Sequence, residues 1–285
     1  MLNTYGGEQA VNVRPATIWH IVTVTFNSAA DLRRHWSDVS LPLGARWTVV
    51  DNASTDDSVE TAQLLGADVI VLRKNVGFGA ANNIGARSVA SSFLLFVNPD
   101  IEIIAESLDA LAETLTEIPS AVVAPQLLND DGTPQPSGRN FPTLTSKVFN
   151  RLPGASTHDY QITADPGQRR YVSWSIGAAV AMRSETFDQV HWDDHFFVYY
   201  EDSDLGIRAW KTGHVVVLDG RVRWVHGWAR ETTRFSIVAW RLELASMAKF
   251  YIRFPHLLLP VGLAKYFHPE RKWIGQDVGR CEYDA

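Results

Sequence analysis

A short apolar run that ends in a proline turn constrains the fold of this chain most. Residues 93–97 (FLLFV) contain no polar side chain, and Asn98, Pro99 and Asp100 follow them directly. Such a run, bounded by a turn, is typical of a strand buried on both faces of a parallel sheet. Proline cannot continue a central strand, so the chain leaves the sheet at Pro99. The pattern predicts that Asp100 lies just past the carboxyl end of a buried strand, where open α/β sheets bind ligands.

Asn-Pro-Asp taken alone is an ordinary turn, and the preceding segments decide between the two interpretations. Strand-like segments at 17–26, 47–50 and 67–72 alternate with helical segments at 31–36, 59–65 and 80–90. Alternation at this spacing predicts a doubly wound, mostly parallel sheet with right-handed crossovers and helices on both faces. The ligand-binding interpretation of Asp100 is therefore the stronger one.

The second half of the chain has a less regular pattern. We expect helices at 102–117, 186–190, 205–211 and 236–254, and strands at 121–125, 171–182, 215–218 and 222–225. A loop rich in Gly, Pro and Asn is expected at 129–142, and residues 147–170 are expected to form a flap or an irregular excursion.

Composition excludes several classes of protein. The chain has 285 residues, 46% of them hydrophobic, and a formal net charge of −6, so nothing in it indicates the basic surface of a nucleic-acid-binding protein. Cys281 is the only cysteine, so no intrachain disulfide forms, which suits a reducing cytoplasm. The first 16 residues lack the pattern of a secretory signal and are expected to be a partly disordered lead-in.

Acidic side chains stand where several of the predicted strands end. Asp51 follows the second strand, Asp100 the fourth, and Glu201 and Asp202 follow an aromatic segment. The Gly77-Phe78-Gly79 turn precedes a helix, and together these features predict a nucleotide site on the rim of the sheet. A dinucleotide fingerprint would need glycine at position 82, which is Asn82, and no phosphate-binding P-loop motif occurs.

Several of these motifs occur in an order that resembles the family-2 glycosyltransferases, closest to their rhamnosyltransferase-like branch. They are IVTVTFN at 21–27, VVDNASTD at 49–56, NVGFG at 75–79 with Asn82-Asn83, NPD at 98–100, PSGR at 136–139 with Phe141-Pro142, and FFVYYEDSDL at 196–205. The resemblance covers roughly residues 18–228. It implies a nucleotide-diphospho-sugar-binding fold of the GT-A type, with a small antiparallel part on the acceptor side. It also implies a divalent metal and inversion at the anomeric carbon.

The same resemblance implies a domain division. Residues 17–228 would form the nucleotide-sugar-binding catalytic domain, and residues 229–285 a C-terminal helical extension packed on it. For the metal, Mg²⁺ or Mn²⁺, it implies Asp100 and His226 as ligands, with Asn98 at the first acidic position of a D-x-D-like motif. Carboxylate oxygens suit either ion, and imidazole suits Mn²⁺ better. His226 could equally be a structural histidine at a buried strand end.

The donor site implied by the resemblance lies around the first three strand ends. Asp51 would accept hydrogen bonds from the base or ribose, although it could instead cap a helix. Lys74 would contact the base or the phosphates, or be a solvated charge at a strand end. The remaining implied donor residues are Thr25, Asn27, Asn52, Asn75, Gly77, Phe78, Asn82 and Asn98.

Asp202 is the general base that the family motif implies, because an inverting transfer needs one group to take the proton of the acceptor hydroxyl. Its acidic neighbours Glu201 and Asp204 would raise a carboxyl pKa, although acids here could also simply favour a helix N-terminus, which is the role expected for Asp204. On the acceptor side we expect Glu201, Gly177 and Trp174. Trp174 could stack on a sugar or belong to the core, and Ser173 stands where the family pattern has Asp.

The expected activity is transfer of a sugar from a dTDP- or UDP-sugar, with dTDP-rhamnose as the leading donor. The acceptor would be a hydroxyl on a glycan, a lipid-linked saccharide or a small molecule. Rival interpretations are a sugar nucleotidyltransferase, for which residues 27–30 make a poor triphosphate loop, and a non-catalytic sugar-nucleotide-binding module. Helix 236–254 carries basic and aromatic residues, so contact with the inner face of the membrane, a homodimer contact and simple docking on the domain all stay open.

Overall fold

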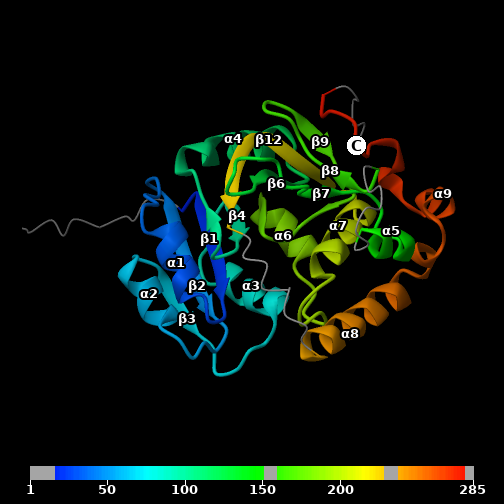
Figure 1. Cartoon of the computed structure of the whole chain (residues 1–285). Helices are drawn as coiled ribbons and strands as arrows, with labels where there is room; N and C mark the ends of the chain where they lie inside the picture. Colours follow the sequence, from blue (N-terminus) through cyan, green and yellow to red (C-terminus); the bar gives the residue numbers. More distant parts are fainter. Residues whose placement is uncertain (1–16, 151–158, 228–236, 280–285) are drawn as a thin grey trace, which may run out of the picture.

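The structure is a computed structural model that describes residues 17–150, 159–227 and 237–279. A nine-stranded sheet lies at its centre, with helices on both faces (Figure 1). Its first four strands are all parallel, in the order β3-β2-β1-β4: β1 (Trp19–Thr25), β2 (Ala45–Asp51), β3 (Asp68–Val71) and β4 (Phe93–Val97). Every residue of β1 and β4 is buried, as expected for strands covered on both faces.

The second part of the sheet is mixed. β11 (Ala179–Arg183) runs antiparallel between β4 and β6 (Ala121–Leu128), and β6 pairs in parallel with β12 (Val215–His226). The short strands β5 (Ile101–Glu102) and β9 (Arg169–Tyr171) pair antiparallel with β12. A separate antiparallel sheet joins β10 (Trp174–Ser175), β7 (Gly138–Arg139) and β8 (Gln161–Ile162). The predicted fold class, a mostly parallel sheet with a small antiparallel part, is confirmed.

The first helices cover the two faces of the parallel half. Helices α1 (Ala29–Trp36) and α2 (Ser58–Leu64) pack together on one face, while α3 (Phe78–Ala86) contacts β1 and β2 from the other (Figure 1). Right-handed crossovers require this, because the strand order reverses direction between β3 and β4. A Cβ at Gly85 of α3 would lie 2.4 Å from a Val22 methyl, so only glycine allows the helix to approach the sheet this closely.

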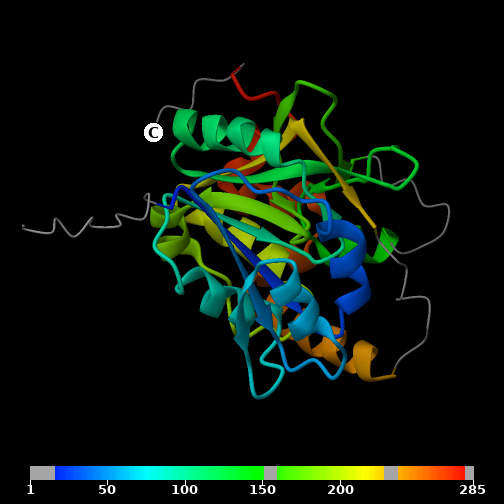
Figure 2. The ribbon, with the colours of Figure 1, turned by 90° about the vertical axis from the view of Figure 1, so that its left-hand side faces the viewer.

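The later helices surround the mixed half. Helix α4 (Leu108–Glu117) lies along β6 and β12, as Figure 2 shows, after a 3₁₀ turn, η1 (Ala105–Ser107). The other elements are α5 (Leu144–Phe149), α6 (Ser184–Val190), α7 (Glu201–Lys211), α8 (Ile237–Arg253), η3 (Pro255–Leu258), α9 (Val261–Ala264), η4 (Lys265–Phe267) and η5 (Pro269–Lys272). Phe250 and Tyr251 of α8 are buried in a second hydrophobic cluster with Tyr200 and Ile207. This helix is therefore docked on the domain, one of the three outcomes left open from the sequence.

Several predicted boundaries in the second half are wrong. The helix expected from residue 102 begins at Leu108, because Ile101 and Glu102 pair with the end of β12. The single strand expected at 171–182 is three strands, because the chain leaves the large sheet after Tyr171, pairs with β7, and returns at Ala179.

Two further corrections concern the elements that carry the acidic segment and the last strand. The strands expected at 215–218 and 222–225 are one strand, β12, with a shift in register between Asp219 and Arg223. The helix expected from Leu205 begins at Glu201. The predicted lead-in (1–16), part of the expected flap (151–158), residues 228–236 and Cys281 lie outside the described residues.

Candidate active site

A cavity of about 860 Å³ opens at the carboxyl ends of the parallel strands. It is bounded by the segments that follow β1, β2, β3 and β4, by the start of α7 and by the end of β12. Ten of the residues selected from the sequence line it: Asn52, Asn75, Gly77, Phe78, Asn98, Asp100, Gly177, Glu201, Asp202 and His226. Residues up to 174 positions apart in the chain, from Asn52 to His226, thus meet at one rim, as the strand-end argument predicts.

The turn after β3 is held in one conformation by amide side chains. Asn52 donates to Asn75 Oδ1 over 2.9 Å and accepts from the Val76 amide over 2.8 Å, and Asn75 Oδ1 also accepts from the Gly77 amide. Gly77 has a φ of 91°, and a Cβ there would lie 2.5 Å from the Phe197 carbonyl oxygen. The turn that resembles a nucleotide-binding motif therefore packs tightly against the segment leading to α7.

Six selected residues do not line the cavity. They are Thr25, Asn27, Asp51, Lys74, Asn82 and Trp174. Asp51 is buried, accepting from the Thr25 hydroxyl over 3.2 Å and from the Ser54 amide over 3.0 Å, so it braces the turn after β2. Asn27 accepts from the Thr55 amide in the same turn. Direct donor contacts of these residues stay predictions.

Trp174 is buried, as expected from the interpretation that it belongs to the core. It is 5% exposed, its indole nitrogen donates to the Asn140 carbonyl over 3.0 Å, and the Lys147 ammonium lies 4.5 Å from its ring centroid. Ser173 beside it is buried and donates to Glu270 Oε1 over 3.1 Å. This part of the chain braces the C-terminal region, and its position gives no support to the acceptor contact expected for Trp174.

Asp100 and His226 lie together on the cavity wall. His226 Nε2 is 3.4 Å from Asp100 Oδ2, and Asp100 Oδ1 is buried without a hydrogen-bond partner among the described residues. Gln135 fixes the histidine from behind, because its amide nitrogen donates to the His226 carbonyl and its amide oxygen faces Nδ1 over 2.9 Å. The amide oxygen can only accept, so Nδ1 carries a proton, and in the tautomer that holds no second proton the Nε2 lone pair would face Asp100.

A lone pair that faces a carboxylate is unfavourable unless a cation or proton stands between them. The buried, partnerless Asp100 oxygen and the oriented imidazole nitrogen are a donor set that suits Mn²⁺, and also Mg²⁺ through the carboxylate. The residues present therefore fit the metal that the resemblance implies.

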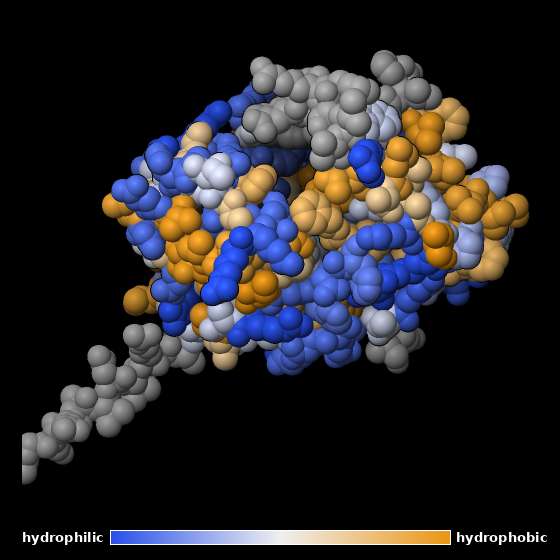
Figure 3. Space-filling model, turned by 90° about the horizontal axis from the view of Figure 1, so that it is seen from below, coloured by the Kyte–Doolittle hydropathy of each residue, from blue (hydrophilic) through white to orange (hydrophobic). Residues whose placement is uncertain are grey.

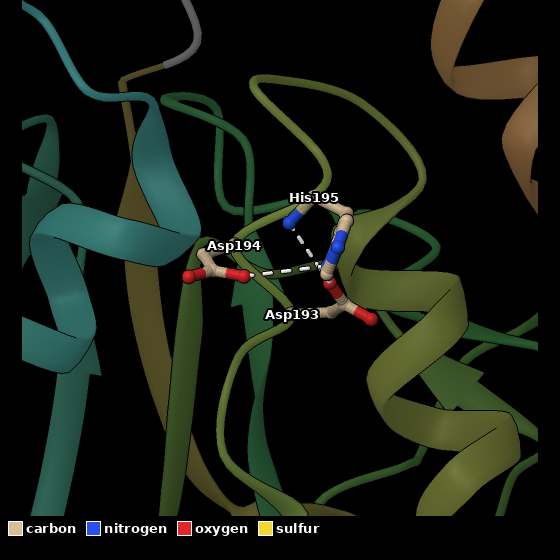
Figure 4. Close-up of side chains that lie close together, drawn as sticks. All are labelled: Asp193, Asp194 and His195. Carbon is tan, nitrogen blue, oxygen red and sulfur yellow. Dashed lines mark hydrogen bonds and ion pairs between the residues drawn. The ribbon is translucent and has the colours of Figure 1, made fainter.

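A second group of potential metal ligands lies between α6 and α7. Ligand atoms of Asp193, Asp194 and His195 lie within 4.8 Å of one another (Figure 4). Burial raises the pKa of Asp193, but hydrogen bonds from His195 and Arg253 outweigh it and lower this pKa to about 2. Arg253 therefore already neutralises one of the acids, and none of the three residues lines the cavity. Asp100 and His226 are the better placed pair.

The first turn of α7 presents its acids to the cavity through an unusual backbone. Tyr199 and Tyr200 both have positive φ angles, 66° and 69°, a conformation that costs roughly 1 kcal/mol or more per residue. Asp202 Oδ1 accepts from the Ser203 amide over 2.6 Å and from the Ser203 hydroxyl over 3.2 Å. Lys147 donates to that hydroxyl over 2.8 Å. Among the described residues Asp202 Oδ2 has no such donor, so it is the oxygen available to a ligand.

The acids on either side of Asp202 have different roles. Asp204 lies in the first turn of α7, as expected, and its fully buried carboxylate accepts from Arg208 over 2.6 Å and from Arg253 over 2.7 Å. Burial, and then the charge of Asp202, raises the pKa of Glu201 to about 8. Glu201 is therefore protonated at neutral pH, so it adds no second negative charge beside Asp202.

This raised pKa makes protein stability depend on pH. Between about pH 5 and pH 8 the folded state holds a proton that the unfolded chain has released, so the free energy of unfolding falls as pH rises. Glutamine does not titrate, so this decrease should be absent from Glu201→Gln. Across that pH range the free energy of unfolding of the variant should fall less than that of the parent, by on the order of a few kcal/mol. Urea unfolding from pH 5 to pH 8.5 measures this, with the exposed Glu106→Gln as the control. Parallel curves for Glu201→Gln and the parent would contradict it.

Three functional candidates were not selected from the sequence. Arg139 lines the cavity, Gln135 orients His226, and Lys147 reaches the Asp202–Ser203 pair. Burial lowers the pKa of Arg139, and the neighbouring charges of Tyr160 and Asp202 act against it. Arg139 lies in the recognised PSGR motif, which could have singled it out, whereas Gln135 and Lys147 carry no local signal.

The cavity lies at the carboxyl ends of the parallel strands, beside the turn after β3 that Asn52 and Asn75 hold, and it contains the carboxylates of Asp100 and Asp202. These features are typical of the class of nucleotide-sugar glycosyltransferases with the GT-A fold. The sequence model described as "Glycosyl transferase family 2" matches residues 20–173, more than half of the chain. The chain belongs to this family, which confirms the predicted resemblance and shows that it is a glycosyltransferase.

Curated relatives cover most of the chain. It is 28% identical over 241 residues to an N-acetylglucosaminyl-diphospho-decaprenol L-rhamnosyltransferase of Mycobacterium tuberculosis, a match that covers 75% of this chain and 77% of that protein. It is 25% identical to a low-salt glycan biosynthesis hexosyltransferase of Haloferax volcanii, over 75% of this chain and 69% of that one.

Solved structures share the fold at lower sequence identity. GalNAc-T7 with UDP, GalNAc and Mn²⁺ superposes with a TM-score of 0.57 at 15% identity, over 75% of this chain and 44% of that one, so this chain spans less than half of it. TarS of S. aureus, residues 1–349 with UDP-GlcNAc, gives a TM-score of 0.53 at 16% identity, over 85% and 70% of the two chains. These likenesses support the GT-A fold.

Proposed function

We propose that this protein is an inverting glycosyltransferase that moves a deoxyhexose, rhamnose, from a nucleoside diphosphate to a hydroxyl of a lipid-linked saccharide. The observation that carries the mechanism is the joint position of Asp202, Asp100 and His226 on one cavity. The rhamnosyltransferase relative, whose named acceptor is a sugar-diphospho-decaprenol, supports the choice of donor and acceptor.

The reaction would be a single displacement. The acceptor hydroxyl attacks the anomeric carbon from the face opposite the diphosphate, and Asp202 Oδ2 takes its proton as the bond to the diphosphate oxygen breaks. Ser203 holds Oδ1, which keeps the carboxylate in one orientation during this transfer. Glu201, protonated at neutral pH, adds no second negative charge that would repel the acceptor oxygen as it becomes nucleophilic.

The diphosphate would leave from the other side of the cavity. Asp100 and His226 would hold Mn²⁺ or Mg²⁺, which supplies Lewis-acid stabilisation of the departing diphosphate. Arg139, a partly buried cation on the same cavity, is suited to a second contact with the phosphates. Asn52 and Asn75 would position the nucleoside through the turn that they brace.

A panel of nucleotide sugars tests the donor assignment. A donor at 100 times its dissociation constant stabilises the folded state by about 2.7 kcal/mol, which for a chain of 285 residues corresponds to a rise in Tm of roughly 5 °C. We expect dTDP-rhamnose with Mn²⁺ to give the largest rise, measured by thermal shift against UDP-GlcNAc, UDP-glucose and free dTDP. A larger rise with a UDP-sugar would overturn the rhamnose assignment and leave the transferase class intact.

The remaining assignments belong to the same proposal. We place the enzyme in the cytoplasm, acting at the inner face of the membrane where lipid-linked acceptors are elongated. No described helix has the length and hydropathy to cross a membrane. The catalytic domain would span residues 17–228, with the C-terminal helices as an extension of it.

A further inference from the structure

The segment after α8 exposes an unusual number of large apolar side chains. Between residues 252 and 267, Leu263, Tyr266 and Phe267 are 57%, 64% and 59% exposed, and Leu258, Leu259 and Val261 are also exposed. In Figure 3 one group of hydrophobic side chains lies at the right-hand edge of the molecule, the side on which Figure 1 places α9, and another lies toward the left. Soluble surfaces rarely keep a contiguous apolar patch of this kind without a partner.

These exposed residues are held in place from beneath. Phe254, Leu257 and Ala264 of the same segment are buried in the cluster that also contains Phe250. Pro260 precedes α9, and the amides of Leu263 and Ala264 donate to its carbonyl. The apolar face is therefore a fixed part of the fold, and its exposure is not the result of a poorly packed end.

The exposed charges of residues 252–272 are opposite in sign to the net charge of the whole chain. Lys265, Arg271 and Lys272 are exposed beside the apolar residues. Glu270 is the only acid between residues 252 and 272, and it is fully buried, within 3.1 Å of His268. A chain with a net charge of −6 thus carries a segment, residues 252–272, with basic and apolar side chains and no exposed acid, and Asp159 beside it is an exposed acid that lines the smaller cavity described below. This combination favours an anionic, apolar partner.

The face also reaches the edge of the active-site cavity. Helix α5 exposes Val148 and Phe149, and Phe149 and Val261 both line a second, smaller cavity of about 220 Å³. The next residue, Asn150, lines the large cavity with Asp202. A continuous surface therefore runs from α9 through α5 to the place where an acceptor hydroxyl would enter.

We propose that the surface formed by α5, η3, α9, η4 and η5, here called the α5–η5 face, lies on an anionic lipid bilayer and receives the acceptor from it. The apolar side chains would enter the interface, while Lys265, Arg271 and Lys272 contact lipid phosphates. The saccharide of a lipid-linked diphosphate would then enter past α5. This use of the face rests on the proposed function, whereas binding to the bilayer can be measured separately.

Vesicle co-sedimentation of the full chain tests the proposal. We expect binding to vesicles of phosphatidylglycerol and phosphatidylcholine, and at least tenfold weaker partitioning to pure phosphatidylcholine. Leu263→Ser/Phe267→Ser should lower partitioning to the anionic vesicles at least tenfold, and Lys265→Glu/Lys272→Glu should do the same while abolishing the preference for anionic lipid. The matched control is Leu43→Ser/Leu64→Ser, which replaces two leucines that are 97% and 81% exposed in the N-terminal half and should bind as the parent does.

All the substituted side chains are exposed, so each variant is expected to fold as the parent does. Circular dichroism and the Tm of each variant check this. Absence of vesicle binding by the parent, or equal loss in the Leu43/Leu64 control, would overturn the proposal. So would a stable dimer by light scattering that Leu263→Ser/Phe267→Ser dissociates, because a second copy would then cover the face. Transfer to a water-soluble acceptor analogue is measured in parallel: vesicle binding without transfer removes the proposed function alone, and transfer without vesicle binding removes this inference alone.

Discussion

Asp202→Asn is expected to lower the rate of sugar transfer at least about a thousandfold while leaving donor binding nearly unchanged. Asparagine has the same shape, and its carbonyl can still accept the bonds that Ser203 donates to Oδ1. It cannot take up the proton of the acceptor hydroxyl, so only the chemical step is lost. Steady-state rates of nucleoside diphosphate release with acceptor, and donor affinity by calorimetry, measure the two effects.

A matched control for this substitution is available on the neighbouring helix. Asp188 of α6 is exposed, and Asp188→Asn makes the same chemical change away from the cavity, so it should transfer sugar at the parent rate. Asp202→Asn turning over at more than about a tenth of the parent rate would remove Asp202 from the mechanism. Equal loss of donor affinity and rate would instead indicate that Asp202 serves in donor binding.

Removal of the Asp100 carboxylate should abolish the metal dependence of donor binding. With Mn²⁺ present, we expect the Asp100→Asn variant to bind the nucleotide sugar at least tenfold more weakly than the parent, a cost of about 1.4 kcal/mol or more. In excess chelator the two proteins should bind it equally, because Asp100 would contact the diphosphate only through the cation. Calorimetry in Mn²⁺ and in chelator gives both comparisons, and His226→Gln should show the same pattern.

The second acidic cluster provides the control for this experiment. Asp194 lies in the Asp193–Asp194–His195 group and is 70% exposed, so Asp194→Asn should bind donor as the parent does in both conditions. If Asp194→Asn abolished the metal dependence and Asp100→Asn kept it, the cation would belong to the exposed cluster between α6 and α7.

Much of the first half of the fold follows from local patterns. The apolar run of β4 has no polar face to present to water and β1 is mostly apolar, so burial on both sides predicts both strands, and Phe93–Val97 is a strand with the predicted bounds. Asn98 and Asp100 line the cavity because parallel strands end at one edge of a sheet, whereas Glu201 and Asp202 reach it from the first turn of α7, which follows no strand. Motif order then assigned the family, which the sequence comparison confirms.

The second half of the fold was harder to predict from the sequence, because its strands form by pairing with segments that are distant in the chain. Residues 171–182 have one apolar pattern, yet they divide between two sheets, since pairing with β12, β7 and β4 outweighs local preference. The pairing of Asp204 has a similar origin: it lies in the first turn of α7 as predicted, but Arg253, 49 residues away, pairs with its carboxylate.

Periodicity, turn residues and motif order are sufficient to predict the doubly wound fold, the family and the acids at the strand ends. These features depend on residues that are close together in the sequence. Contacts between distant residues decide the rest. Gln135 sets which nitrogen of His226 faces Asp100, burial keeps Glu201 protonated beside Asp202, and packing beneath α9 leaves its apolar side chains in solvent. Hydrogen-bond partners, desolvation and surface exposure are properties of the folded arrangement, and no local stretch of sequence contains them.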